Sequence, residues 1–157
     1  MKTFLFFVAL IAAGSPWADD NHPHATPAQE KLGNVSFPIS CTPAAQEQFN
    51  VAVAMLHSFW YDEAEKTFRQ VAVTDPNCAM AYWGITMSLY RQLWATPPSA
   101  EDLQKGQDAL QKARTLNIKT EREKAYLNAV DFLYRDAEKT RYAARKLAYE
   151  KAMAQVY

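Results

Sequence analysis

Apolar residues recur at steps of three and four from about residue 44 to the end of the sequence, which is the spacing of amphipathic helices. Short breaks divide this pattern into six blocks. Four blocks follow a helix-start signal, in which Ser, Thr or Asp stands before a proline or three residues before an acid. These signals are Thr42 with Pro43, Asp75 with Pro76, Ser99 with Asp102, and Thr120 with Glu123. No segment alternates as a strand does. The pattern predicts an all-α chain with helices at about 44–58, 62–73, 77–94, 100–116, 121–135 and 138–157.

The composition agrees with a helical domain and excludes several classes of protein. The 157 residues carry 17 basic and 17 acidic side chains, and only 4 are glycine. A nucleic-acid-binding domain normally carries a basic surplus, and a disordered chain has a large net charge with few aromatic residues. Four glycines also argue against glycine-rich phosphate loops. We therefore expect a folded helical domain with no nucleic-acid partner.

The first 18 residues have the layout of a secretory leader. Lys2 supplies a positive start, residues 4–13 form an apolar run too short to span a bilayer, and small residues follow. Cleavage after Gly14 and cleavage after Ala18 are both open, and we take 1–18 as the signal peptide. The leader predicts export to the periplasm or the extracellular space, with no integral membrane segment in the mature chain.

An extended arm is predicted over residues 19–41, because three prolines, one glycine and scattered polar residues leave no helical period there. The mature chain holds two cysteines, Cys41 and Cys78. An even number in an exported chain predicts one disulfide, and the alternative is two buried thiols. Neither cysteine has a second Cys or His at chelating spacing, so we expect no metal site and no cofactor.

The helical part also repeats itself. Small and bulky residues recur at matching steps in successive blocks: Tyr61, Ala64, Phe68 and Val71, then Ala81, Tyr82, Ile85 and Leu89, then Gly106, Leu110, Ala113 and Leu116. On these residues the chain resembles the tetratricopeptide repeat (TPR), closely in two helix pairs and loosely in a third. Residues 57–64 and 75–84 are similar to a group of exported bacterial TPR proteins of undefined role.

The resemblance implies a helical-hairpin solenoid of about three repeats over residues 42–157, and the alternative is an unrelated helical bundle. First helices of neighbouring units would lie side by side, which places Cys41 and Cys78 at the same end of adjacent helices. A complete solenoid normally ends in a polar capping helix, whereas Val156 and Tyr157 continue an apolar pattern. We therefore expect this region to be truncated at its C-terminus, as the first part of a longer repeat protein.

A second apolar stripe on the predicted helix 77–94 is the candidate binding surface. In TPR folds the corresponding stripe lines the concave face, so the resemblance implies a groove that binds an amphipathic helix or an extended peptide. Arg91 could receive a carboxylate from such a peptide, or it could pair with a nearby acid. The arm could also fill the groove. The predicted groove residues are Phe49, Val53, Leu56, His57, Met80, Trp83, Met87, Tyr90, Arg91 and Trp94.

These observations predict a noncovalent protein- or peptide-binding scaffold of the bacterial cell envelope, with no reaction of its own. The alternative is a structural or accessory domain of a larger envelope protein, its groove filled from within. An enzyme or metal-binding module is the third possibility. Asp62, Glu63 and Glu65 could be drawn as a carboxylate cluster for such a module, but acids at a helix start favourably meet the positive end of the helix dipole. The residues identify neither the partner nor the oligomeric state.

Overall fold

Six α-helices and no strand make up residues 32–91 and 96–156, the part of the chain that this computed structural model describes. The all-α prediction is confirmed for these residues. The predicted signal peptide and residues 19–31 of the predicted arm lie outside them. The helices are α1 (Pro43–His57), α2 (Tyr61–Thr74), α3 (Ala79–Tyr90), α4 (Ala100–Arg114), α5 (Glu121–Asp131) and α6 (Tyr142–Met153).

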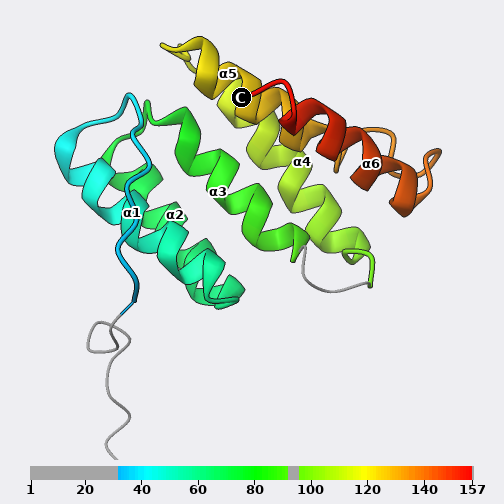
Figure 1. The fold of residues 1–157 in the computed structure, drawn as a ribbon, viewed down its shortest axis with the longest axis horizontal. Helices are drawn as coiled ribbons and strands as arrows, with labels where there is room; N and C mark the ends of the chain where they lie inside the picture. The colour runs from blue at the N-terminus through cyan, green and yellow to red at the C-terminus, as the bar shows by residue number, and fades with distance from the viewer. Residues whose placement is uncertain (1–31, 92–95, 157) are drawn as a thin grey trace, which may run out of the picture. The chain divides into compact units, whose positions relative to one another are not determined.

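The helices pack in successive pairs, α2 beside α1, α4 beside α3 and α6 beside α5 (Figure 1). Helix α3 also contacts α1 and α2, and α5 contacts α3 and α4. This central position explains the composition of α3, in which every residue except Tyr82 is buried. A helix that is apolar all round is a buried helix, so the two apolar stripes seen in the sequence both face protein.

All four expected helix starts can be compared with the structure. Asp75 does not cap a helix, because α3 begins at Ala79 with Cys78 before it. The Ser99 and Thr120 side chains accept hydrogen bonds from the backbone N–H groups three residues on, at 3.0 and 3.1 Å, as their spacing predicts. Thr42 makes no such bond with its side chain. Its backbone N–H donates instead to the Asp75 carboxylate at 2.9 Å, which ties the start of α1 to the start of the second pair.

Three helix ends differ from the prediction, and one of them is that of α6, which ends at Met153 and not at 157. Helix α3 ends at Tyr90 and not near residue 94, because Arg91 takes a left-handed conformation with φ of 47°. Helix α5 ends at Asp131, where the backbone hydrogen bonds tighten to three-residue steps. That turn carries Leu133 and Tyr134 into the core, where both are fully buried, so tertiary packing overrides the helical pattern. Helix α6 consequently begins at Tyr142 and not near 138.

Close helix crossings depend on glycine at two positions. A Cβ added to Gly84 of α3 would overlap the ring of Phe68 on α2, and one added to Gly106 of α4 would overlap the ring of Tyr134. Phe68 has no room to withdraw, because it is fully buried and packs against Phe49 at a centroid distance of 5.4 Å. The glycines therefore allow each pair of helices to approach its neighbour.

Gly84→Ala is expected to destabilise the protein despite the better helix propensity of alanine. Overpacking a core costs about 1–3 kcal/mol, and the propensity gain offsets only about 1 kcal/mol of that cost. Urea unfolding followed by circular dichroism measures the difference. Gly33→Ala is the control, since nothing lies within 4 Å of its added Cβ. Equal midpoints for the two variants would contradict the account.

Candidate functional site

The part of the arm before α1 is an extended segment that lies on the helices. Val35, Phe37, Ile39 and Cys41 pack against the core, whereas Ser36 and Pro38 between them are exposed. The arm passes over α1 in Figure 1, where it is the blue segment. Residues 35–41, called the arm strand below, therefore present alternate side chains to the helices, with the period of two that extended backbone imposes.

Phe37 is the centre of the contact between the arm strand and the helices. Its ring lies 5.5 Å from Phe49 of α1, 5.5 Å from Trp83 of α3 and 5.1 Å from Tyr126 of α5, measured between centroids. The Arg122 guanidinium covers the ring, with its central carbon 4.5 Å from the centroid. One side chain of the arm strand thus joins the first helices of all three pairs.

Side chains of α1 bind the backbone of the arm strand. The Ile39 N–H donates to the Gln46 side-chain oxygen at 2.8 Å, and the Gln46 amide nitrogen donates to the Phe37 carbonyl at 2.9 Å. The Phe37 N–H donates to the Asn50 side chain at 3.3 Å. The Gln46 side chain therefore accepts a hydrogen bond from one backbone group of the arm strand and donates one to another, as a neighbouring β-strand would.

Residues at and just before the start of α5 bind the other edge of the arm strand. The buried Glu123 carboxylate accepts from the Ser40 N–H at 2.6 Å and from the Ser40 hydroxyl at 2.5 Å. Arg122 donates to the Pro38 carbonyl at 2.9 Å, and Lys119 donates to the Ser40 carbonyl at 3.1 Å. The Glu123 carboxylate, placed by spacing to complete a capping box, is used to hold the arm strand.

A disulfide between Cys41 and Cys78 anchors the end of the arm strand, and the Cα atoms of the two residues lie 5.2 Å apart. The disulfide prediction is confirmed. Asp75 stands beside it, 8% exposed, and accepts from the N–H groups of Thr42 and Asn77. The start of α1 and the start of α3 are therefore joined by one covalent bond and one shared carboxylate.

Most of the predicted groove residues lie inside the protein. Of the two possibilities left open by the sequence, an open groove or one filled by the arm, the structure has the filled one around Trp83. Phe37 contacts the stripe at Trp83, near the start of α3. Toward the end of α3 the stripe is covered by tyrosines, since Tyr142 stacks on Tyr90 at 5.6 Å and the Tyr149 hydroxyl reaches the Met87 sulfur at 3.9 Å. The buried members are Phe49, Val53, Leu56, Met80, Trp83, Met87 and Tyr90.

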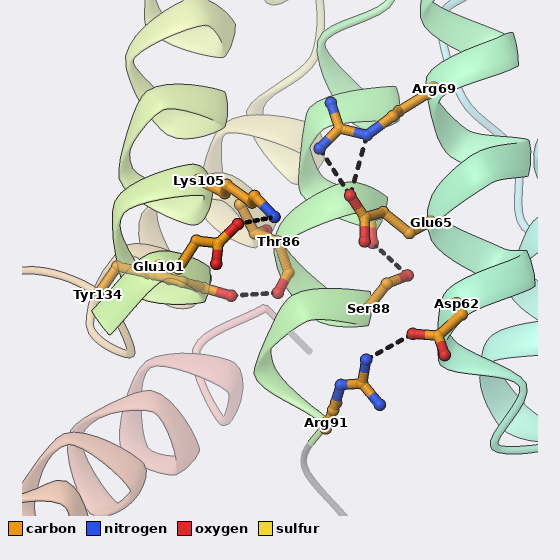
Figure 2. Close-up of polar contacts among 10 residues, drawn as sticks. Asp62, Glu65, Arg69, Thr86, Ser88, Arg91, Glu101, Lys105 and Tyr134 are labelled. Carbon is orange, nitrogen blue, oxygen red and sulfur yellow. Dashed lines mark hydrogen bonds and ion pairs between the residues drawn. The ribbon is translucent and has the colours of Figure 1, made fainter. Parts of the chain in front are cut away.

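The other three predicted groove residues do not join this cluster. Arg91 is exposed and forms an ion pair with Asp62 at 2.5 Å, so it has the acidic partner that was its alternative role (Figure 2). His57 is exposed in the last turn of α1. Trp94 lies outside the described residues.

Two polar features of the interior bear on what the site can do. The Trp83 indole N–H is buried and has no acceptor among the described residues, which leaves its hydrogen-bonding capacity unused. Burial raises the pKa of the Tyr134 phenol well above its usual value, and burial together with Tyr142 raises the pKa of Tyr90. The Tyr134 hydroxyl donates to the Thr86 carbonyl (Figure 2). Because the pKa of each phenol is raised, both tyrosines are neutral at physiological pH and act as packing groups.

The acids at the start of α2 are all engaged in ion pairs. Asp62 pairs with Arg91, Glu63 with Lys66 at 2.7 Å, and Glu65 with Arg69 at 2.6 Å. Within residues 32–91 and 96–156, no three His, Cys, Asp or Glu side chains come together as a metal site. No helix of this same part combines the length and the apolar character needed to cross a membrane.

Comparison with known proteins assigns no family to this geometry. No protein-family model matches the chain, and searches of curated proteins and of solved structures return no match.

The sequence allowed the arm to fill the groove, but it did not identify most of the residues that hold the arm strand. Asn50, Arg122 and Glu123 were assigned no binding role. The available signal was the alternation of apolar residues over 35–41, which is that of an extended segment with one buried face. It was hidden by Pro38, which is tolerated because its neighbours Phe37 and Ile39 supply the bonded N–H groups.

Replacing both cysteines with alanine is expected to lower the free energy of unfolding by about 2–4 kcal/mol, because the disulfide closes a long loop in the unfolded chain. The loop spans 37 residues. Urea unfolding of the double variant and of the oxidised protein measures the loss. Non-reducing mass analysis is the accompanying check, and alkylation of both thiols in the unreduced protein would contradict the bridge.

Proposed function

We propose that this chain is a structural helical-repeat domain of an exported bacterial envelope protein, with its cleft closed by its own arm. The observation that carries the proposal is the position of Phe37 among aromatic residues of α1, α3 and α5. A surface occupied in this way is part of the core of the domain. The Cys41–Cys78 disulfide supports export, because such bonds persist in oxidising compartments.

A tetratricopeptide-like arrangement is the form that we propose for this domain. Its support is that the residues carrying the resemblance lie at helix contacts: Ala64, Phe68 and Val71 of α2 are fully buried, and Gly84 and Gly106 lie at close crossings. The contacts of α3 with both helices of the first pair, and of α5 with both helices of the second, agree with a stack of helical hairpins.

Phe37→Ala is expected to lower the free energy of unfolding by about 2–4 kcal/mol, because it empties an aromatic site and removes the anchor of the arm strand. Denaturant unfolding monitored by tryptophan fluorescence suits the test, since Trp83 is a neighbour of the ring. Phe59→Ala is the matched control, as Phe59 is 54% exposed. Equal stability of the two variants would show that the arm is not part of the folded core.

A peptide-binding scaffold is the second candidate, and the way in which the arm strand is held favours it. The bonds from Gln46, Asn50, Arg122 and Lys119 reach backbone atoms of the arm strand, which any extended peptide offers. The buried Trp83 N–H has no acceptor among the described residues, so a ligand that carries an acceptor at this place would gain a hydrogen bond. In this case the cleft binds a partner segment with an aromatic residue in the place of Phe37 once the arm has left.

A labelled peptide of residues 33–40 tests this second candidate. We expect the Phe37→Ala protein to bind it at least tenfold more tightly than the wild-type protein, since a tethered arm competes at millimolar effective concentration. Fluorescence anisotropy gives both affinities. A peptide with alanine in the place of Phe37 is the control. Absence of binding to the Phe37→Ala protein, shown to be folded by circular dichroism, rules this candidate out and leaves the structural role.

A further inference from the structure

The outer side of the third helix pair holds an apolar groove of about 520 Å³. Its floor is built from alanines that recur one turn apart on both helices, and its rim is polar. All of its lining residues belong to α5, to α6 and to the turns directly after these two helices, so no other helix of the described residues lines it. The lining residues, called the α5–α6 groove below, are Ala125, Asn128, Ala129, Phe132, Ala148, Lys151, Ala152 and Gln155.

The two preceding pairs show what such a groove holds. Helix α3 lies against both α1 and α2, and helix α5 lies against both α3 and α4 (Figure 1). In each case one helix covers the side that a pair presents to the next. The α5–α6 groove lies between the two helices of the third pair, on residues of α5 other than Tyr126, which packs against Trp83 of α3. By analogy with the two earlier pairs, the occupant that fits it is a helix.

The same interfaces indicate the side chains of the occupant. Where the second and third pairs meet, Gly106 of the covered helix α4 faces the ring of Tyr134, which follows α5. The α5–α6 groove offers four alanines and one aromatic residue, Phe132, so most of its apolar lining can take the place of the small partner in such a contact. Ala125 of α5 and Phe132, the residue after that helix, are seven positions apart, which in helical geometry is a rise of about 10 Å. An occupant of about two turns thus spans the groove, with large apolar residues at the first, fourth or fifth, and eighth positions.

Charge adds a second requirement. Five basic and two acidic side chains lie between Glu138 and Val156, although the whole chain is balanced. Lys151 stands on the rim of the groove, and it forms no ion pair with any described residue. An acidic side chain of the occupant can reach this ammonium group. A basic occupant would instead add to the local positive charge.

We propose that the α5–α6 groove binds one amphipathic α-helix of a partner polypeptide, with large aromatic or aliphatic side chains on its apolar face and acidic residues along its edge. This site is separate from the cleft that the arm strand fills. It gives the domain an interaction surface whether or not the arm leaves its place.

The chain supplies its own probe for this proposal. A synthetic peptide of residues 120–135 reproduces the helix that covers the second pair, and a version with Arg122→Glu and Lys124→Glu has an acidic edge. We expect both labelled peptides to bind the full chain saturably in fluorescence anisotropy, the acidic one at least threefold more tightly. Ala152→Glu, which fills and charges the groove, is expected to weaken binding at least tenfold.

Matched variants keep the test specific. Ala143→Glu places the same change at an exposed position of α6 outside the groove and should leave binding unchanged. Lys151→Glu, an exposed change that leaves the floor intact, should remove the preference for the acidic peptide, whereas Lys139→Glu should not. Circular dichroism shows that each variant is folded. Failure of both peptides to bind, or equal binding by Ala152→Glu and Ala143→Glu, overturns the proposal.

Two other results would assign the groove to a different occupant and would also overturn the proposal. A wild-type dimer in sedimentation that Ala152→Glu converts to a monomer identifies a second copy of this chain. Peptide binding by the chain that begins at Asp19, but not by the full chain, identifies the first 18 residues. A monomeric full chain that binds the acidic peptide supports a partner helix.

Discussion

An extended segment cannot satisfy its own backbone, and this constraint organises the structure. The arm strand lies among helices whose backbone groups are already paired, so its N–H and C=O groups need partners from side chains. Gln46 supplies both a donor and an acceptor, and Glu123 accepts twice from Ser40. The dependence is mutual, because a buried carboxylate without donors would be costly. Without the start of α5 the Ser40 N–H loses its acceptor, and without the arm strand the Glu123 carboxylate loses its two Ser40 donors.

Helix α3 is the second element on which the packing of the domain depends. It touches α1, α2, α4 and α5, and its aromatic residues meet different neighbours along its length. Trp83, near its start, packs against Phe37 and Tyr126, whereas Tyr90, at its end, packs against Tyr134 and Tyr142. A continuous apolar stripe is thus divided between the arm and the tyrosines after α5. The stripe does not face one continuous groove, because two separate parts of the chain cover it.

Local signals in the sequence predicted the helices well, since apolar spacing and capping residues act within a few positions. Ser99 and Thr120 begin their helices as their side chains indicate. The disulfide also followed from simple reasoning on cysteine number. Prediction failed where distant residues decide: α5 stops at Asp131 because Tyr134 turns inward to reach Thr86, which lies 48 positions earlier. The role of Glu123 was hidden for the same reason, because Ser40 is 83 positions away.

That separation has a consequence for how the chain reaches its folded state. Contacts within and between successive helix pairs join residues close in sequence, and such contacts form quickly, whereas a bond across 83 positions waits for the whole intervening chain. The arm strand is synthesised first, yet its last partners are among the latest residues to exist. Until α5 is made, the Phe37 ring lacks its contacts with Tyr126 and Arg122, and Ser40 lacks the Glu123 carboxylate. The segment that closes the finished domain is therefore incompletely covered during synthesis, and its full docking requires the first helix of each of the three pairs.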